Sequence, residues 1–187
     1  TNYSDHQFSL MGFNINATTV AGGSGAGSAA NQLNNPRGIS FDGSGNLYVS
    51  DIFNHRVQKW VPGATTGVTV AGTGVSGSAP DQLNGARGIA FDRSGNMYLA
   101  DSFNHRVQKW APGATTGVTV AGTGFSGSAA NQLSRPYGVI VDASGNLYVL
   151  DSDNHRVQKW ASGATSGVTV AGGNGMGSNS NQFSSPY

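Results

Sequence analysis

The sequence has no cysteine, no glutamate and little charge of either sign. Without cysteine it can form no disulfide scaffold, no thiolate zinc site and no cysteine nucleophile. Its 10 basic and 9 acidic residues give a net charge of +1, and like charges nowhere form a run. This balance lacks the positive footprint of proteins that hold phosphate backbones, so we do not expect nucleic acid as a partner.

Long hydrophobic runs are also missing. No apolar segment approaches the roughly 18 residues of a membrane span, and Thr1 does not open a basic-then-apolar leader. We therefore expect a soluble chain without a membrane span, either a processed product or part of a longer protein. The sequons at Asn2 and Asn16, together with the many Gly, Ser, Thr and Asn residues, favour an extracellular location.

Glycine and repetition are what the sequence has in abundance. Its 29 glycines among 187 residues indicate a turn-rich, all-β chain. The heptapeptide Asn-His-Arg-Val-Gln-Lys-Trp ends at Trp60, Trp110 and Trp160, which gives a period of 50 residues. A fixed period of this size indicates a propeller or a solenoid, in which a repeated residue is first a structural candidate.

One period predicts four short strands. In the second repeat they lie at 87–91, 97–100, 106–110 and 118–121. Turn-forming Asp, Asn, Gly and Pro residues separate them, and the Gly/Ser/Ala stretch 122–128 crosses to the next repeat. Four antiparallel strands followed by a longer connection describe one blade of a β-propeller.

The string from Asn46 to Val57, preceded by Pro36-Arg37-Gly38-Ile39 and Asp42-Gly43-Ser44-Gly45, resembles the NHL repeat. The Asn-His pair of its signature is present at Asn54-His55, and Arg56-Val57 replace the third letter. Three full copies cover residues 31–73, 81–123 and 131–173. The resemblance implies a β-propeller that usually serves as an interaction platform, with RNA-binding, lyase and sensor-ectodomain members in related groups.

The chain ends suggest how the repeats are arranged. We expect one propeller segment over 1–187, with about 3.5 four-stranded blades. Its parts are a degenerate outer half-blade at 1–30, three blades at 31–80, 81–130 and 131–173, and the start of a truncated repeat at 174–187. Ser4–Met11 and Thr18–Gly22 align with the outer strands of a blade. Because propellers need four to eight blades, we expect a homodimer that closes a seven- or eight-bladed ring.

The repeated polar and aromatic residues are expected to be structural. Asp, His and Arg would hold the turn after the second strand, and Trp would fill the space between blades. These residues are Asp51, His55, Arg56 and Trp60, then Asp101, His105, Arg106 and Trp110, then Asp151, His155, Arg156 and Trp160. Two other interpretations stay open: a ligand-stacking Trp, and a zinc site of His55, His105 and His155 such as amidating lyases of the wider NHL group use.

The turns 42–46, 92–96 and 142–146 begin like a calcium-binding loop. Calcium needs six to eight oxygen ligands, and the closing glutamate of an EF-hand has no counterpart in a chain without glutamate. We therefore interpret these segments as hairpin turns with an Asx hydrogen bond. We expect no metal and no cofactor.

Two groups of residues are candidates for ligand binding. Arg37, Arg87 and Arg135 lie just before the innermost strands, near one propeller face. Val75, Phe125 and Met176 occupy one position in successive Gly-rich loops, with Ala26 matching them, and this variation suits a contact surface as well as simple drift.

No nucleophile lies beside a base in a recognisable catalytic arrangement. The sequence therefore favours a non-enzymatic scaffold for protein or glycan ligands. The alternatives are a zinc-dependent lyase built on the three repeated histidines, and RNA binding through Arg37, Arg87 and Arg135.

Overall fold

The computed structural model describes residues 18–184 and 186–187. Twelve strands form three four-stranded antiparallel sheets, each in chain order. The first sheet holds β1 (Pro36–Phe41), β2 (Leu47–Asp51), β3 (Arg56–Trp60) and β4 (Val68–Ala71); the second holds β5 (Ala86–Phe91), β6 (Met97–Asp101), β7 (Arg106–Trp110) and β8 (Val118–Ala121); the third holds β9 (Pro136–Val141), β10 (Leu147–Asp151), β11 (Arg156–Trp160) and β12 (Val168–Gly172). We call these sheets blades 1, 2 and 3.

Each blade begins with a tight hairpin whose turn follows from its residues. In blade 2 the amide of Asp92 donates to the carbonyl of Asn96, and the amide of Gly95 donates to the carbonyl of Asp92. Gly95 has φ 79°, a left-handed conformation that glycine adopts without strain. The strands that follow are rich in β-branched and aromatic residues, which favour a pleated and packed surface.

A single 3-10 turn joins the second and third strands of every blade. These turns are η1 (Ile52–Asn54), η2 (Ser102–Asn104) and η3 (Ser152–Asn154). Each ends at a histidine in the left-handed region, with φ between 46° and 50°. No other helical segment occurs in the described part of the chain, and none there is long and apolar enough to cross a membrane.

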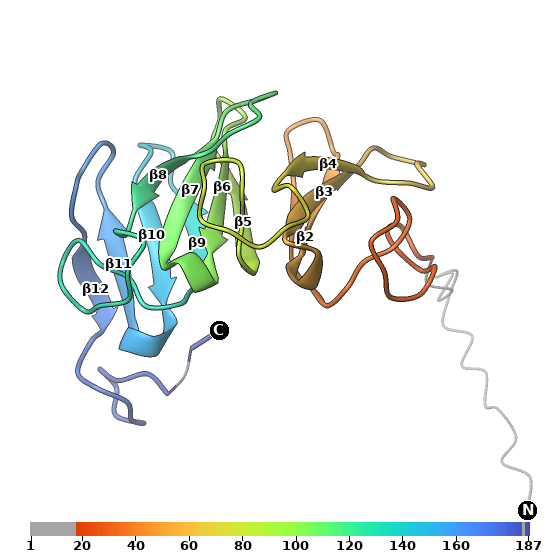
Figure 1. Cartoon of the computed structure of the whole chain (residues 1–187). Helices are drawn as coiled ribbons and strands as arrows, with labels where there is room; N and C mark the ends of the chain where they lie inside the picture. The colour runs from red at the N-terminus through yellow and green to blue at the C-terminus, as the bar shows by residue number, and fades with distance from the viewer. Residues whose placement is uncertain (1–17, 185) are drawn as a thin grey trace, which may run out of the picture.

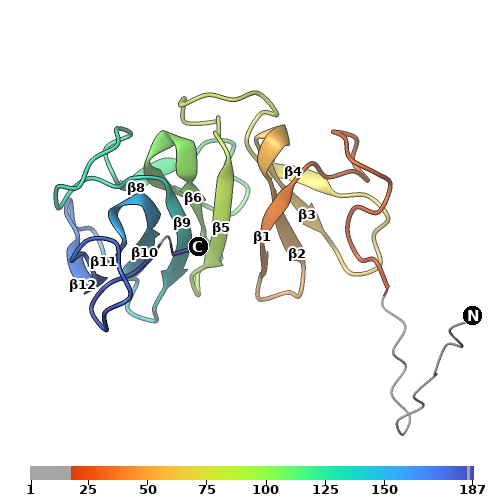
Figure 2. The ribbon, with the colours of Figure 1, turned by 90° about the horizontal axis from the view of Figure 1, so that it is seen from below.

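The three blades lie side by side along an open arc (Figures 1 and 2). Their innermost strands β1, β5 and β9 contact one another in turn. The approach is close because glycine stands at the crossing points: a Cβ on Gly88 would lie 2.8 Å from the carbonyl oxygen of Tyr137. The arc is not closed into a ring, and the architecture is that of an open β-propeller segment.

The core lies between the blades rather than inside any one of them. One buried cluster joins Tyr48 and Val57 of blade 1 to Leu99 and Trp110 of blade 2. A second cluster joins blade 2 to blade 3 around Trp160. Because blade 2 lies between the other two blades and is covered on both sides, its strand β6 is buried at every residue.

The two outward faces of the arc lack this cover. Ile39 of β1 is 69% exposed, whereas its counterpart Ile89 of β5 is 8% exposed beneath blade 1. At the other end Ile140 of β9 is 65% exposed, and its counterpart in blade 2 is the buried Ala90. The terminal blades thus present apolar side chains of the kind that other blades bury.

Only part of the half-blade expected at residues 1–30 lies within the described residues. Residues 18–22, which the sequence predicts as a fourth strand, form no strand. The other part of that prediction, residues 1–17, lies outside the described residues. At the C-terminal end, residues 174–187 contribute a single bridge between Met176 and Phe183, and Ser185 is outside the described residues.

Candidate functional site

The repeated Asp and Arg residues form a buried anchor in each blade, which we call the Asp–Arg anchor: Asp51–Arg56, Asp101–Arg106 and Asp151–Arg156. In blade 2, Asp101 accepts hydrogen bonds from the Asn84 amide (2.7 Å), Asn104 Nδ2 (2.8 Å) and Arg106 Nε (2.8 Å). The carboxylate of Asp101 is fully buried. Both carboxylate oxygens thus accept hydrogen bonds from this chain, and neither is exposed to a ligand.

The arginine of the anchor holds the crossing loop that precedes its blade. Arg106 donates to the carbonyls of Ser78 (2.9 Å), Ala79 (3.2 Å) and Gln82 (3.2 Å). The same contacts recur for Arg56 and Arg156. The repeated arginines therefore hold the fold together, as is usual for residues that recur in stacked repeats.

The repeated histidines also serve the turns. Each ends a 3-10 turn in the left-handed region, and Nδ1 of His105 accepts a hydrogen bond from the Arg135 amide at the start of blade 3 (3.1 Å). In the part of the chain that the structure describes, no three His, Cys, Asp or Glu residues lie together in a way that could hold a metal ion. His55, His105 and His155 therefore do not form the zinc cluster that the alternative interpretation requires.

The repeated tryptophans are buried, as predicted. Trp60, Trp110 and Trp160 are 2–3% exposed. The indole Nε1 of Trp110 donates to Oε1 of Gln108 (3.2 Å), which satisfies its polar atom inside the core. None of the three rings is available to stack on a ligand.

The aspartates of the hairpin turns bind their own turns. Asp42 accepts from the amides of Ser44 (2.9 Å) and Asn46 (3.0 Å), and from the hydroxyl of Tyr48 (3.1 Å). Burial alone would raise the pKa of Asp42, but these hydrogen bonds and that from the Asn46 side chain lower it to about 2. Burial and the same contact raise the pKa of Tyr48 to about 12.

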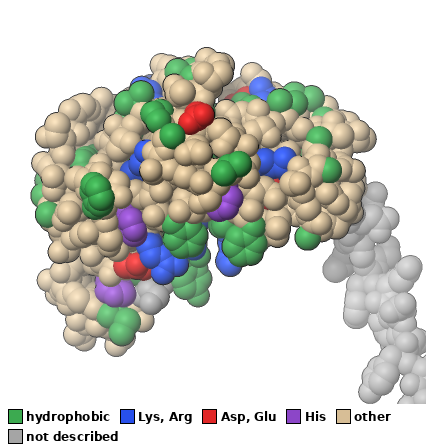
Figure 3. Space-filling view, in the orientation of Figure 1, with side chains coloured by type: hydrophobic (Ala, Val, Ile, Leu, Met, Phe, Trp, Pro, Cys, Tyr) green, Lys and Arg blue, Asp and Glu red, His purple; other side chains and the backbone are tan. Residues whose placement is uncertain are grey.

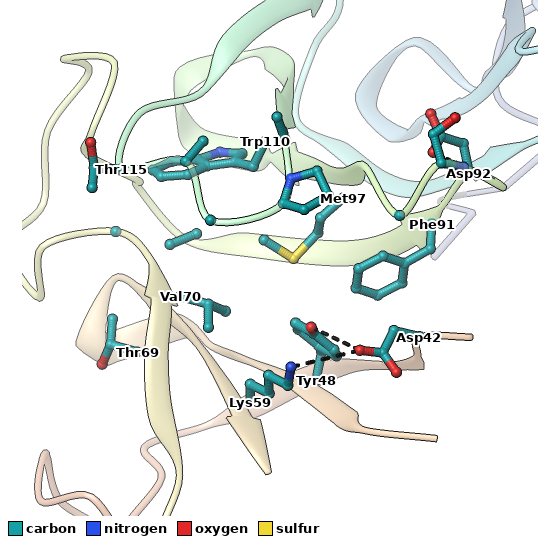
Figure 4. Close-up of a pocket in the computed structure, with 18 of the residues that line it drawn as sticks. Asp42, Tyr48, Lys59, Thr69, Val70, Phe91, Asp92, Met97, Trp110 and Thr115 are labelled. Atoms are coloured by element: carbon teal, nitrogen blue, oxygen red, sulfur yellow. Dashed lines mark hydrogen bonds and ion pairs between the residues drawn. The ribbon is translucent and has the colours of Figure 1, made fainter. Parts of the chain in front are cut away.

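A groove of about 980 Å³ runs between blades 1 and 2 beside this turn. Tyr48, Phe91 and Met97 face its interior, and the rings of Tyr48 and Phe91 meet edge to face at 4.6 Å (Figure 4). Lys59 Nζ lies 3.8 Å from Asp42 at the rim. A second groove of about 530 Å³ lies between blades 2 and 3, where Tyr98, Lys109 and Leu147 occupy the positions of Tyr48, Lys59 and Met97, so the groove belongs to the repeat.

The Gly-rich loops expose the residues that the sequence singled out. Val75, Phe125 and Met176 are all largely exposed. Their predicted equivalence is wrong, however, because Met176 forms the bridge that Ser76 and Ser126 form in the earlier loops. Val75 and Phe125 lie one residue before the bridging position of their loops, so they are not equivalent to Met176.

The arginines that the sequence grouped together are not equivalent either. Arg37 and Arg87 occupy the second position of β1 and β5, where β9 has Tyr137. Arg135 precedes β9 and stands in the left-handed region with φ 48°. The sequence indicated one such arginine per blade. It did not predict that Arg87 and Arg135 would lie beside the aromatic rings of Phe103 and Tyr137.

We call the resulting group the arginine–aromatic cluster: Arg87, Phe103, Arg135, Tyr137 and Asp153. The guanidinium carbon of Arg87 lies 3.9 Å from the ring centroid of Tyr137 and 5.3 Å from that of Phe103. Arg135 also lies 5.3 Å from the Phe103 ring, and its Nε is 3.9 Å from the Asp153 carboxylate. In the space-filling view, basic, acidic and hydrophobic side chains lie together along the lower edge of the molecule (Figure 3).

The charge of Arg87 is not balanced within this cluster. Burial lowers the pKa of Arg87, the neighbouring cations Arg135 and Arg37 lower it further, and Tyr137 and Asp153 oppose that change. The cluster residues differ between blades: position 103 is Phe in two blades and Asp in the third, and position 137 is Arg in the other two. Variation within an otherwise near-identical repeat is the signal by which the sequence could have revealed them.

The comparison with protein families agrees with the repeat pattern. The family model of the NHL repeat matches residues 33–60 and 133–160. These segments lie in blades 1 and 3 and end at Trp60 and Trp160. No curated protein matches the chain.

Solved structures of β-propeller proteins resemble the fold. They include an auxiliary nutrient binding protein from Bacteroides thetaiotaomicron, with TM-score 0.62 and 17% identity over 84% of this chain and 43% of that one. A nidogen/laminin complex gives TM-score 0.57 and 22% identity over 73% and 48%. A further protein from B. thetaiotaomicron gives 0.55 and 20% over 63% and 32%. The chain thus spans about a third to a half of the length of these structures.

Proposed function

The chain carries NHL repeats on a β-propeller fold, and from this premise we propose that it is a non-enzymatic scaffold for protein or glycan ligands, with proteins the preferred class. One observation carries the proposal. The Asp and Arg residues of the anchors are common to all three blades, and each pair binds its own turn and crossing loop. Several residues that differ between blades instead lie together in the arginine–aromatic cluster.

The cluster has the chemistry of a protein-binding face. Arginine and tyrosine are enriched among the residues that dominate interface energies, and loops placed on a rigid scaffold are common binding elements. The nidogen/laminin complex is an example of a similar fold beside a protein partner, although an identity of 22% extends the likeness to the fold alone. We therefore infer the class of partner from the residues of the cluster itself.

A protein and glycan array would test the scaffold function. We expect purified chain to bind protein members, and we expect Phe103→Ala to weaken that binding at least tenfold because Phe103 is exposed in the cluster. Phe53→Ala is the matched control, since Phe53 is the equivalent exposed residue of blade 1 and lies outside the cluster. Equal loss in both variants, or no binding by the wild type, contradicts the proposal.

The lyase alternative predicts a metal. Elemental analysis of the purified protein would find stoichiometric zinc that disappears in His105→Ala with the fold intact. That result would favour the lyase over the non-enzymatic scaffold. RNA binding, the third candidate, predicts retention of oligonucleotides with a steep dependence on salt.

We also propose that a second copy of this chain covers the exposed end faces. Ile39 and Phe41 of blade 1 correspond to the residues with which blade 2 covers blade 1, and Ile140 and Val170 lie on the opposite face of blade 3. The two end faces therefore match as the halves of one inter-blade interface. A twofold dimer would use this interface twice, and it would close a ring of seven or eight blades if residues 1–30 of each copy add the expected half-blade to the three described sheets.

Sedimentation at micromolar concentration tests the assembly. We expect a dimer for the wild type and a monomer for Ile140→Arg. Val118→Arg is the control, because Val118 is equally exposed on an outer strand rather than an end face. A folded wild-type monomer would contradict the dimer while leaving the binding function to its own test.

A further inference from the structure

Arg87 is a buried arginine without a polar partner. Its residue is 9% exposed, yet its guanidinium donates no hydrogen bond and forms no ion pair with any residue that the structure describes. Its Nε is buried and unpartnered. A guanidinium carries five N–H donors, and a buried charge without a partner is costly.

The fold itself shows how this chain satisfies a buried arginine. Arg106, in the same blade and 8% exposed, binds the Asp101 carboxylate and three backbone carbonyls. Arg87 instead lies over the Tyr137 ring, with the Phe103 ring nearby, and such rings contact a guanidinium without using its N–H groups. The donors at the edge of the Arg87 fork therefore remain free.

The surroundings of Arg87 select a negative ligand. Arg135 and Arg37 are its cationic neighbours, and Asp153 is the one acidic group described among the charges that act on it. Asp153 lies against Arg135 rather than Arg87, and both side chains of that pair are about half exposed. An exposed pair of this kind is weak, so it does not neutralise the cluster.

The position of Arg87 is fixed by the fold. Its carbonyl oxygen lies where a Cβ on Gly38 of β1 would collide with it, and Gly88 meets the backbone of Tyr137 and Gly138 in β9. The backbone on both sides of Arg87 is thus held between the neighbouring inner strands. With its backbone held and the Tyr137 ring 3.9 Å from its guanidinium carbon, the Arg87 side chain has less conformational entropy to lose when it binds.

We propose that the Arg87 guanidinium, which lies over Tyr137 and near Phe103, binds a side-chain carboxylate of an acidic protein segment. A planar carboxylate can accept two parallel hydrogen bonds from the guanidinium edge, and the flanking rings offer apolar contact to the rest of the segment. Arg135 and Arg37 supply further attraction for negative charge. This inference rests on the proposed scaffold function and names the chemistry of its ligand.

A paired peptide array tests the proposal. Each peptide carries a central Asp or Glu, and its twin carries Asn or Gln at that position. We expect wild-type protein to bind acidic members at least tenfold more tightly than their twins. We expect Arg87→Gln to abolish that difference and Arg87→Lys to reduce it, because lysine keeps the charge but lacks the fork. Arg93→Gln, at an exposed turn, should bind as the wild type does.

Three results would overturn the proposal. The first is equal binding of acidic peptides and their twins, and the second is an acidic-peptide signal that Arg87→Gln leaves unchanged. The third is Arg87-dependent binding of oligouridylate or an oligouronate when no acidic peptide binds. If neutral proteins bind in a Phe103-dependent and Arg87-independent manner, the carboxylate site fails while the scaffold function stands.

Unfolding of the ligand-free protein provides an independent measurement. If the Arg87 charge has no partner until ligand binds, Arg87→Met should unfold at the same urea concentration as the wild type or a higher one. Arg106→Met should unfold at a lower concentration, because it leaves the Asp101 carboxylate buried and unpaired. An equal drop in both variants would mean that Arg87 is already paired within the fold, and it would overturn the proposal.

Discussion

Arg106 and Arg87 are two buried arginines of blade 2 with opposite surroundings. Arg106 lies in the Asp–Arg anchor that every blade repeats, and its donors are taken by a carboxylate and loop carbonyls. Arg87 lies in the arginine–aromatic cluster, which differs from blade to blade, and its donors have no described acceptor. Repetition in this chain marks the residues that hold the blades, and variation marks the cluster that we propose binds a partner.

This comparison predicts that substitutions in the repeated layer lower stability far more than substitutions in the variable cluster. Trp110→Ala should show the largest effect, a loss of about 3–5 kcal/mol in the free energy of unfolding, as for other large aromatic residues removed from a core. Phe103→Ala, in the cluster and 40% exposed, should cost about 1 kcal/mol, in the usual range for a partly exposed position. Urea denaturation measures both, and similar losses would break the comparison.

Charge gives a second matched pair. Asp101→Asn removes the partner of a buried arginine and should cost about 3 kcal/mol, at the lower end for a broken buried pair because the amide oxygen still accepts. Asp153→Asn disrupts the half-exposed contact with Arg135 and should cost no more than about 1 kcal/mol. A larger effect at Asp153 in the same urea titrations would place that residue in the structural layer.

Backbone approach sharpens the comparison further. Gly88→Ala would place a Cβ 2.8–2.9 Å from the β9 backbone and should cost about 1–3 kcal/mol through overpacking. Gly43→Ala is the control, because nothing lies within 4 Å of its Cβ position, and it should stay within about 0.5 kcal/mol of the wild type. Thermal melts of the two variants should therefore separate clearly.

The smallest expected effect is a dependence on pH at the hairpin turns. The pKa of Asp42 falls from 3.8 to about 2 on folding, so its contribution is present above pH 3.8 and is lost as the pH falls through 2. The pKa of Tyr48 rises from 10.0 to about 12, so its contribution is lost as the pH rises from 10 to 12. Melting temperatures of Asp42→Asn and Tyr48→Phe should vary less than those of the wild type across the acidic and alkaline ranges, respectively. Parallel curves would disprove the assignment.

The sequence alone predicted the blades well because their signals are local. A 50-residue period, four apolar runs and the turn residues between them indicated four antiparallel strands per repeat, and three such sheets are present. The burial of Trp110 followed from its place in the repeat. Residues 18–22, which were expected to form a fourth strand, carry no strand, and the residues expected to pair with them lie outside the described part of the chain.

The candidate site was harder to predict because its members come from separate repeats. Counting one arginine per blade grouped Arg135 with Arg37 and Arg87, although their backbone positions differ. Likewise, Met176 was aligned with Val75 and Phe125 one residue out of register. Both errors arose because residues of different repeats were matched by their type. The hydrogen bonds between strands and within loops decide which residues are equivalent.

By itself the sequence determined the repeat, the strand order within a blade and the layer of buried Asp and Arg residues, because the period repeats the contacts of each anchor with a loop no more than 28 residues away. The burial of the tryptophans also followed from the repeat, although they pack against the neighbouring blade. Only the tertiary structure decided which side chains of different blades meet. Arg87 lies on Tyr137 because β5 and β9 approach closely at Gly88. The same packing left two apolar end faces open, since a blade buries its surface only against a neighbour.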